Sequence, residues 1–416
     1  MIEETPSVIY LGLDDFPLGL AETQKVRLVA KGLIAAGVTV TVLSRWWSVA
    51  PWKEKEQFPP CGVFESIPYV NACGTLSRPD GWIARKATRL RGIVKEFAVL
   101  YASSRHNQIT AIISTGSVSR VLYYRVMAAF LGFPIIVHVV EYYSSIARHS
   151  QWRRRLNAYL FDEWVPLLVD GVLPISQFLV ERITRRFPNK RWLKDPGLVD
   201  LSRFDGIERQ PGPDYFLFCG YVGYMEIVQF ILQAFERLDP VNEVQLYLVL
   251  NGTESEFARF HRELASLKRQ NSVRIISDLT DRELSQLYVD AYALLIPLRP
   301  TDQDRARFPH KIGEYCASSR PIITTAVGEV GERFAHGVNA YVAQDSSVEA
   351  FSTMLNEALE DRSRADEIGM RGREFAEREL DYHCFGLRMK TFITELSAEV
   401  GHLPRHSARE VAHENR

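Results

Sequence analysis

Charged side chains that could bind a phosphate gather in residues 305–325, the segment RARFPHKIGEYCASSRPIITT. Pro309 suits the first turn of a helix, so Lys311 and Glu314, three residues apart, are predicted to project from one face near its start. A helix start offers free N–H groups and partial positive charge to an anion, and Lys311 adds a full charge. The segment therefore predicts a diphosphate site in which Glu314 accepts hydrogen bonds from a sugar's vicinal hydroxyls. The alternative is a solvent-exposed Lys311–Glu314 pair.

A second candidate group lies at the end of the apolar run PIIVHVV, residues 134–140. Glu141 follows this predicted strand. Because parallel sheets bind ligands at the carboxyl ends of their strands, Glu141 is well placed as a base or an orienting group. His138, inside the strand, is a further catalytic candidate. The alternatives are a structural carboxylate paired with a nearby arginine and a buried histidine that is satisfied within the core.

Motifs of several other enzyme classes are absent from the sequence. No GxGxxG follows the first predicted strand and no GxxxxGK(S/T) occurs, which argues against a dinucleotide oxidoreductase and a P-loop nucleotidase. Asp302 and Asp304 have the spacing of a carboxylate metal site, but we interpret it as a coincidence in a loop rich in charge. Five scattered cysteines without a CxxC pair indicate neither disulfides nor zinc. We therefore predict no metal and no cofactor.

The elements that must position these residues alternate between strand and helix. Residues 7–45 indicate a strand, a turn-rich loop, a helix and a β-branched strand, which together form a βαβ unit. Near-continuous apolar strands separated by helices indicate a parallel sheet covered on both faces. The further strands are predicted at 111–115, 134–140 and 171–176, and the helices at 118–131 and 151–168.

A second unit begins after a Pro- and Gly-rich stretch at about 187–214, which we interpret as the interdomain linker. The strand and helix patterns restart at 215–223. We therefore predict an α/β protein of two Rossmann-like, doubly wound domains that face each other across a cleft. The predicted parts are an acceptor-side domain at 1–195, a donor-binding domain at 205–383, a C-terminal helix at about 384–400 that could pack back on the first domain, and a flexible tail at 401–416.

The 416 residues are 46% hydrophobic and 24% charged, with a formal net charge of −1. This composition excludes a disordered chain, and no run of about 18 apolar residues is present to span a bilayer. Acidic residues stand at the N-terminus where a signal peptide has basic ones, so we expect a cytoplasmic protein. The charge is uneven, because residues 1–200 hold 25 basic and 17 acidic side chains and the remainder holds 25 and 34. The basic half is expected to face an anionic partner, for which membrane surface and nucleic acid are the usual candidates.

Residues 78–105 concentrate the basic charge, with seven Lys or Arg and two acidic residues interleaved with apolar ones such as Trp82, Leu90 and Phe97. Together with HSQWRRRL at 149–156, this segment predicts an amphipathic basic surface suited to an anionic leaflet. We accordingly predict peripheral association with the inner face of the membrane and no nucleic-acid partner. A core helix with a solvated basic face is the alternative.

Five segments in order along nearly the whole chain resemble the GT-B glycosyltransferases, and in particular the retaining glycosyltransferase family 4. The family begins with a glycine-containing loop, a helix and a strand, and these resemble the segment FPLGLAETQKVRLVAKGLIAAGVTVTVLS. The family's strand beside the reacting sugar resembles PIIVHVVEYYSS, in which Glu141 stands at the acidic position. The segments around its linker resemble VDGVLPISQFLVERI and PGLVDLSRF. Its donor-site signature resembles FPHKIGEYCASSRPIITTAVGEVGERFAHGVNAYV.

The resemblance implies roles for individual residues. Glu314 corresponds to the second glutamate of the family's E-x7-E motif, which implies contact with the nucleotide ribose, and Lys311 corresponds to the lysine of the P-x-K-x-x-E-Y variant. The other implied donor-site positions are Gly220 at the end of the first donor-domain strand, Leu279 in the base-contacting loop and Gly19 in the loop that approaches the diphosphate from the other domain.

The chain departs from the family pattern at three places. The histidine that precedes the family's acidic position falls on Val140, with His138 two residues earlier. The first glutamate of E-x7-E falls on Ala306, so the usual carboxylate that holds the donor sugar is missing. The basic pair after the first donor-domain strand is missing too, because Tyr221 stands where an arginine is common. We hypothesise that the diphosphate charge is met instead by Lys311 with Arg299, Arg305 or Arg307.

The resemblance implies transfer of a sugar from a nucleotide-sugar donor to an acceptor hydroxyl with retention, without a metal and without a side-chain nucleophile. With the basic surface, the acceptor is expected to be a lipid-linked sugar or another polysaccharide precursor. One alternative is a non-hydrolysing nucleotide-sugar 2-epimerase, but the sequence does not show the set of acid–base carboxylates and histidines that such an enzyme needs around the sugar. The other is a catalytically silent GT-B subunit that binds a nucleotide or a partner. The donor base and sugar stay open.

Overall fold

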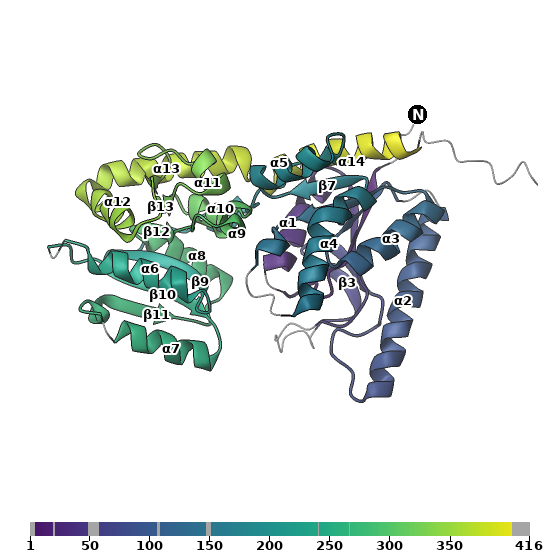
Figure 1. The fold of residues 1–416 in the computed structure, drawn as a ribbon, viewed down its shortest axis with the longest axis horizontal. Coiled ribbons are helices and arrows are strands. Elements are labelled where there is room, and N and C mark those ends of the chain that lie inside the picture. The colour runs from purple at the N-terminus through teal and green to yellow at the C-terminus, as the bar shows by residue number, and fades with distance from the viewer. Residues whose placement is uncertain are drawn as a thin grey trace, which may run out of the picture.

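The computed structural model describes residues 5–19, 21–48, 58–105, 109–146, 151–239, 241–265 and 267–401. Two α/β lobes stand side by side, each built on its own sheet (Figure 1). We call the lobe with the eight-stranded sheet the first domain and the lobe with the six-stranded sheet the second domain. This architecture confirms the predicted fold of two doubly wound α/β domains. Of the expected tail, residues 402–416 lie outside the described residues.

The first domain has a sheet of strand order β3-β4-β2-β1-β5-β6-β7-β8, in which all pairs are parallel except β3 with β4. Its strands are β1 (Ser7–Leu11), β2 (Thr39–Ser44), β3 (Cys61–Phe64), β4 (Ile67–Asn71), β5 (Ala111–Ser114), β6 (Ile135–Val139), β7 (Gly171–Pro174) and β8 (Arg191–Trp192). Its helices are α1 (Ala21–Ala35), α2 (Trp82–Arg105), α3 (Val118–Leu131), α4 (Trp152–Leu168) and α5 (Gln177–Arg186), with the short turn η2 (Tyr143–Ser145).

The second domain has an all-parallel sheet of order β11-β10-β9-β12-β13-β14. Its strands are β9 (Tyr215–Tyr221), β10 (Gln245–Asn251), β11 (Val273–Ile276), β12 (Ala293–Ile296), β13 (Ile322–Thr325) and β14 (Tyr341–Ala343). Its helices are α6 (Met225–Glu236), α7 (Glu254–Leu264), α8 (Asp281–Asp290), α9 (Asp302–Arg305), α10 (Lys311–Ala317), α11 (Gly328–Arg333), α12 (Val348–Glu360) and α13 (Arg362–Glu379).

The strands that the sequence predicts are the buried inner ones. Strands β5, β6 and β7 are buried along their whole length, as a sheet with helices on both faces requires. The antiparallel edge made by β3 and β4 was not expected, because β3 is mostly exposed and its four residues carry no strong apolar pattern.

The chain passes between the domains twice, and the two passages lie side by side. The linker forms the first passage and the segment between α13 and the last helix, α14 (Tyr382–Gly401), forms the second, with a parallel bridge between Val199 and Asp381. Figure 1 shows α14, in yellow, lying along the first domain, where it packs against α1. A β-carbon on Gly386 would clash with the carbonyl oxygen of Gly32, so two glycines permit this close helix crossing.

Candidate functional site

In both sheets the carboxyl ends of the central strands open onto one cleft between the domains, which has a volume of about 460 Å³. In the first sheet β1 lies between β2 and β5, and Thr115 and Gly116, which follow β5, line the cleft. In the second sheet β9 lies between β10 and β12, and Gly220 and Pro297 line the cleft from the ends of β9 and β12. Such points, where the strand order reverses, are where doubly wound sheets bind ligands.

Lys311 begins α10 and lines the cleft from the second domain. A β-carbon on Gly313 would stand 2.9 Å from Cβ of Val199, so this glycine lets α10 pack closely on the linker. Glu314, on the same helix, pairs with Arg203 instead, and no acidic side chain in the described part of the chain forms an ion pair with Lys311. Lys311 therefore offers its charge to an anionic ligand in the cleft.

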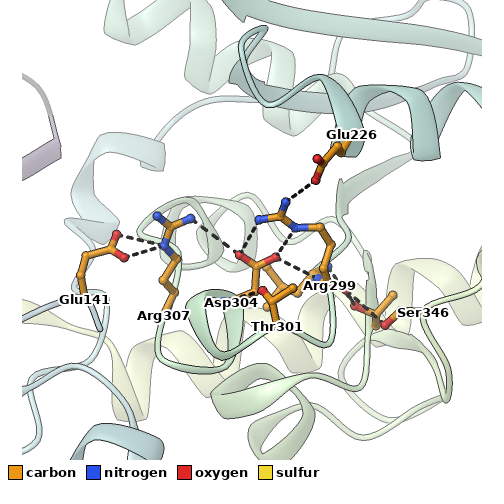
Figure 2. A network of polar contacts seen from close by, with 9 residues as sticks. Glu141, Glu226, Arg299, Thr301, Asp304, Arg307 and Ser346 are labelled. Carbon is orange, nitrogen blue, oxygen red and sulfur yellow. Dashed lines mark hydrogen bonds and ion pairs between the residues drawn. The ribbon is translucent and has the colours of Figure 1, made fainter. Parts of the chain in front are cut away.

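Arg307 and Glu141 form an ion pair that joins the two domains across the cleft (Figure 2). Arg307 Nε donates to both carboxylate oxygens of Glu141, at 2.9 and 2.8 Å. Burial raises the pKa of Glu141, and the Arg307 guanidinium counteracts only part of that rise. A carboxylate with a raised pKa at the carboxyl end of a strand is suited to general acid–base work.

The ion pair continues into a chain of charges within the second domain (Figure 2). The buried carboxylate of Asp304 lies 3.7 Å from Arg307 Nη1 and accepts hydrogen bonds from Arg299 Nε and Nη2, at 2.8 and 3.1 Å. Arg299 also donates to Glu226 at 2.7 Å. Three carboxylates thus share two guanidiniums. Two of the three arginines that were expected to meet a diphosphate, Arg299 and Arg307, are thus paired with protein carboxylates in this structure.

A second, more deeply buried network adjoins the cleft in the first domain. Asp195 of the linker is fully buried, with Lys25 Nζ 2.8 Å and His138 Nδ1 2.9 Å from its Oδ2 atom. Tyr10 OH contacts the other ring nitrogen of His138, Nε2. Tyr10, Lys25 and His138 all line the cleft. The network therefore ties β1, β6 and α1 to the linker that leads to the second domain.

Electrostatics fix the charge states in this network. Burial by itself raises the pKa of Asp195, but Lys25 and His138 outweigh it and lower that pKa to about 2. Burial and the nearby Lys25 charge lower the pKa of His138. The same two causes lower the pKa of His310, which lines the cleft from the second domain, to about 4. At neutral pH the network therefore holds a Lys25–Asp195 ion pair beside two neutral imidazoles.

The structure brings five of the predicted site residues together in the lining of the cleft: Glu141, His138, Gly220, Arg307 and Lys311. The first two come from the first domain and the other three from the second. A ligand that carries a negative charge and hydroxyl groups fits this arrangement, because the second domain contributes the cation of Lys311 and the first domain contributes the carboxylate of Glu141.

Four predicted donor-site residues do not line the cleft. Glu314 lines a neighbouring hollow, where its Oε1 lies 2.7 Å from Arg203 Nη1. Arg305 is half exposed and directed at an acidic neighbour of its own helix. Leu279 packs against the core, and Gly19 lies in the loop before α1. The predicted face shared by Lys311 and Glu314 is thus divided between two hollows, and the roles of these four residues in donor binding stay predictions.

Lys25 and Asp195 were not expected at the site. For Lys25 a signal exists in the sequence, because it stands four and eight residues before Val29 and Leu33 and so lies on the buried stripe of α1. A lysine on such a stripe is buried only when it is paired. Asp195 carries no such signal, because it lies outside regular structure and its partners come from distant parts of the chain.

The carboxylates Asp302 and Asp304 do not converge, because Asp302 is exposed and Asp304 is buried against Arg299. Within the described ranges, no group of three or more His, Cys, Asp or Glu side chains is placed to hold a metal ion. Among the helices of the described residues, none has both the length and the apolar character to cross a membrane.

Comparison with known sequences identifies a domain in the second half of the chain. Residues 203–375 match the family described as "Glycosyl transferases group 1". A glycogen synthase of Mycobacterium tuberculosis is 23% identical over 279 residues, a match that covers 62% of this chain and 62% of the relative. The chain thus spans less than two thirds of the length of this curated relative.

Solved structures resemble the chain over almost its whole length. Sucrose-phosphate synthase from Thermosynechococcus elongatus has a TM-score of 0.72 at 15% identity, with 95% of this chain and 100% of that chain covered. HepE of Anabaena, in complex with UDP and glucose, has a TM-score of 0.67 at 14% identity, with 94% and 100% covered. At such identities the likeness concerns the fold. The match to glycosyl transferases group 1 thus lies in the second domain, and the chain as a whole has the two-domain GT-B fold that its sequence resembles.

Proposed function

We propose that the chain is a glycosyltransferase that moves a sugar from a nucleotide-sugar to an acceptor hydroxyl, with retention, in the cleft between its domains. The observation that carries the proposal is the position of Lys311, a cation without an acidic partner in the described part of the chain, opposite Glu141 of the other domain. The group 1 domain supports this function. A nucleotide-sugar donor is further supported by the complex of HepE with UDP and glucose.

The proposed reaction separates a sugar from a nucleoside diphosphate. The diphosphate gains negative charge as it leaves, and a fixed cation stabilises that charge in the transition state. Lys311 supplies this cation in the proposal, and Arg307 joins it when the incoming diphosphate competes with Glu141. The acceptor hydroxyl then attacks the oxocarbenium-like carbon from the side of the leaving group. No side-chain nucleophile and no metal are required.

Glu141 is proposed to act on the reacting sugar or the acceptor. Ala306, at the place of the usual donor-sugar carboxylate, is fully buried, so this position offers the ligand no polar side chain. Glu141 enters the cleft from the opposite domain with a raised pKa. Once Arg307 turns to a diphosphate, the freed carboxylate can orient a hydroxyl or receive its proton.

The acceptor is proposed to be a lipid-linked sugar or another glycan precursor, met at the cytoplasmic, anionic surface of a membrane. The basic amphipathic segment at 78–105 supports this part of the proposal. Donor identity is open, since the base and the sugar are chosen by the local shape of the cleft.

The decisive experiment measures donor binding and transfer separately. UDP-, GDP-, ADP- and dTDP-sugars are screened for thermal stabilisation, and a true donor at 100 times its Kd should add about 2.7 kcal/mol to the folded state. Lys311→Ala should lower kcat/KM for that donor on the order of 10²-fold, since the substitution removes the fixed cation. Lys268→Ala, which alters an exposed lysine that does not line the cleft, is the matched control. Wild-type kinetics in Lys311→Ala would refute the role of this residue.

A catalytically silent nucleotide-binding subunit is the second candidate function. Two observations favour it: the missing carboxylate at Ala306 and the pairing of Arg299 and Arg307 with protein carboxylates. This candidate predicts thermal stabilisation by a nucleotide or nucleotide-sugar with no transfer and no donor hydrolysis. Release of nucleoside diphosphate by the purified chain would exclude it.

A further inference from the structure

Three neighbouring helices of the first domain, α2, α3 and α4, cover the same face of its sheet (Figure 1). Their inner residues, among them Leu100, Tyr124 and Phe161, belong to one core cluster. Helix α3 contacts α2 on one side and α4 on the other. The outward faces of the three helices therefore adjoin and form one side of the molecule, which we call the outer helical face.

Helix α3 is apolar on its outward side as well as its inward side. Leu122, Val126 and Phe130, each four residues apart, are exposed in one row, and Phe130 is 81% exposed. Val121 and Tyr124 on the opposite side are fully buried against the sheet. An apolar row on the outward side of a surface helix is normally covered.

Helix α4 repeats this pattern. Trp152, Leu156 and Tyr159 are exposed at helical spacing, while Phe161 and Val165 are buried against the sheet. The exposed row begins in the first turn with Trp152, which is 67% exposed. The predicted segment at 149–156 supplied the start of this row, but the apolar stripe of α3 had no counterpart in the sequence prediction.

Helix α2 adds apolar side chains at the other edge of the face. Ile83, Leu90, Val94 and Phe97 are exposed along its length. Three adjacent helices thus expose apolar rows on the same side of one domain. Exposed apolar surface of this extent on a water-soluble domain marks an interaction site.

The exposed charge around these rows is mostly basic. Four acidic residues occur between positions 82 and 168, the range that contains α2, α3 and α4, and each has a partner within the protein. Glu163 of α4 pairs with Arg182 and Arg186, and the neighbouring Asp162 accepts hydrogen bonds from the amides of Tyr143 and Ser144. Glu96 is buried in an ion pair with Arg45, and Glu141 lies in the cleft with Arg307. The exposed basic residues of α2 and of the first turn of α4 are Lys86, Arg89, Arg91, Lys95, Arg105, Arg153, Arg154 and Arg155.

We propose that the outer helical face is a docking surface for an anionic lipid bilayer, which takes the rows of α3 and α4 as well as that of α2. Apolar side chains enter the boundary of the acyl chains while the surrounding Lys and Arg meet the headgroup phosphates. A second copy of the chain fits the face poorly, because it would bring two basic surfaces together without acidic partners. This proposal does not depend on sugar transfer.

The position of α4 sets how the bilayer would lie relative to the cleft. Helix α4 follows β6, whose carboxyl end opens onto the cleft, and the turn η2 between them contacts α9 of the second domain. Trp152 in the first turn of α4 therefore stands at the cleft side of the domain. If the proposed function holds, a lipid-linked acceptor would reach the cleft past this end of the docking surface.

Flotation of the full chain with vesicles tests the proposal. Wild-type chain should float with phosphatidylcholine vesicles that contain phosphatidylglycerol, and less with phosphatidylcholine alone or at high salt. The triple variant Leu122→Ser, Val126→Ser, Phe130→Ser should bind at least about tenfold more weakly, since three exposed apolar side chains are lost. Arg153→Gln with Arg154→Gln should also weaken binding roughly tenfold or more.

The matched control is Leu387→Ser with Met370→Ser, which removes exposed apolar side chains of α14 and α13 and should leave binding unchanged. All variants should keep the wild-type Tm, because the altered residues are exposed. Absence of wild-type flotation, or equal flotation by the triple variant, would overturn the proposal. A wild-type dimer that the triple variant abolishes, measured by light scattering without lipid, would assign the face to a second copy instead. Lys311→Ala should float like the wild type, so failure of sugar transfer and failure of membrane docking are told apart.

Discussion

Arg307 of the second domain donates from Nε to both carboxylate oxygens of Glu141 of the first domain, at 2.9 and 2.8 Å. The pair crosses the cleft and links the carboxylate that the sequence predicts in the first domain to an arginine of the second. A guanidinium binds carboxylate and phosphate groups with similar geometry, so a diphosphate can compete with Glu141 for Arg307. In the proposed function, donor binding is therefore expected to release Glu141 from Arg307.

Replacement of Glu141 by glutamine tests this coupling. Glu141→Gln keeps the shape but removes the charge and the basicity, so kcat should fall on the order of 10²-fold or more if the carboxylate orients or deprotonates the acceptor. Donor-induced thermal stabilisation should persist or increase, because Arg307 no longer has a carboxylate competitor. Glu374→Gln, on the exposed side of α13, is the control. An unchanged kcat in Glu141→Gln would remove Glu141 from the reaction and leave it a structural carboxylate.

The buried Lys25–Asp195 pair is predicted to be essential for the stability of the first domain. Lys25→Met leaves the Asp195 carboxylate buried without its main counter-charge, which should cost about 3–5 kcal/mol of unfolding free energy. The double variant Lys25→Met, Asp195→Asn should lose less than the sum of the single variants, since neither charge is then left alone.

Tryptophan fluorescence during urea unfolding is the suitable measurement. All seven tryptophans lie within the first 192 residues, so the signal reports on the first domain. Additive losses in the double variant would show that the pair contributes no coupling energy.

Acid should destabilise the chain through His310. The pKa of this histidine is lowered to about 4 in the folded chain, whereas an unfolded histidine titrates near pH 6.5. The unfolded state therefore binds more protons between these values, and stability is lost as pH falls from about 6.5 to 4, by on the order of 3 kcal/mol. His310→Gln should show a smaller fall of Tm over this range.

His261→Gln, which alters an exposed histidine of α7, serves as the comparison and should follow the wild-type curve. Parallel pH profiles for the wild type and His310→Gln would contradict the burial of a neutral imidazole at this position.

The crossing of α1 and α14 should not tolerate a single added methyl group. A β-carbon on Gly32 would clash with the carbonyl oxygen of Tyr382, and one on Gly386 would clash with the backbone of Gly32. Either Gly→Ala change should therefore destabilise the chain by about 1–3 kcal/mol through forced backbone shifts, despite the higher helix propensity of alanine. Gly212→Ala, where a β-carbon would meet no atom within 4 Å, should be neutral or slightly stabilising. Equal thermal stability of Gly32→Ala and Gly212→Ala would show that the helices do not cross this closely.

The sequence by itself determined the inner strands, the helices between them and the fold class. Apolar strands such as IIVHV and SVIYL, the breakers between them and the helical spacing in α1 depend on neighbours a few residues apart, so local patterns were enough to predict two doubly wound domains. Lys311 and Glu141 were predicted as site residues in the same way, because the start of a helix and the carboxyl end of a strand are recognisable positions, whereas Gly220 was implied by the family resemblance.

Only the tertiary structure decided which charges meet. The pairs Arg307–Glu141 and Lys25–Asp195 join residues that are far apart in the sequence, and nothing near Asp195 marks it as buried. The division of Lys311 and Glu314 between two hollows, and the outward apolar row of α3, likewise depend on what packs against each helix face. Helical periodicity shows that a face is apolar, but only the positions of all the elements show whether that face is covered. For this chain they place a carboxylate of one domain on an arginine of the other and leave three helices apolar toward the outside.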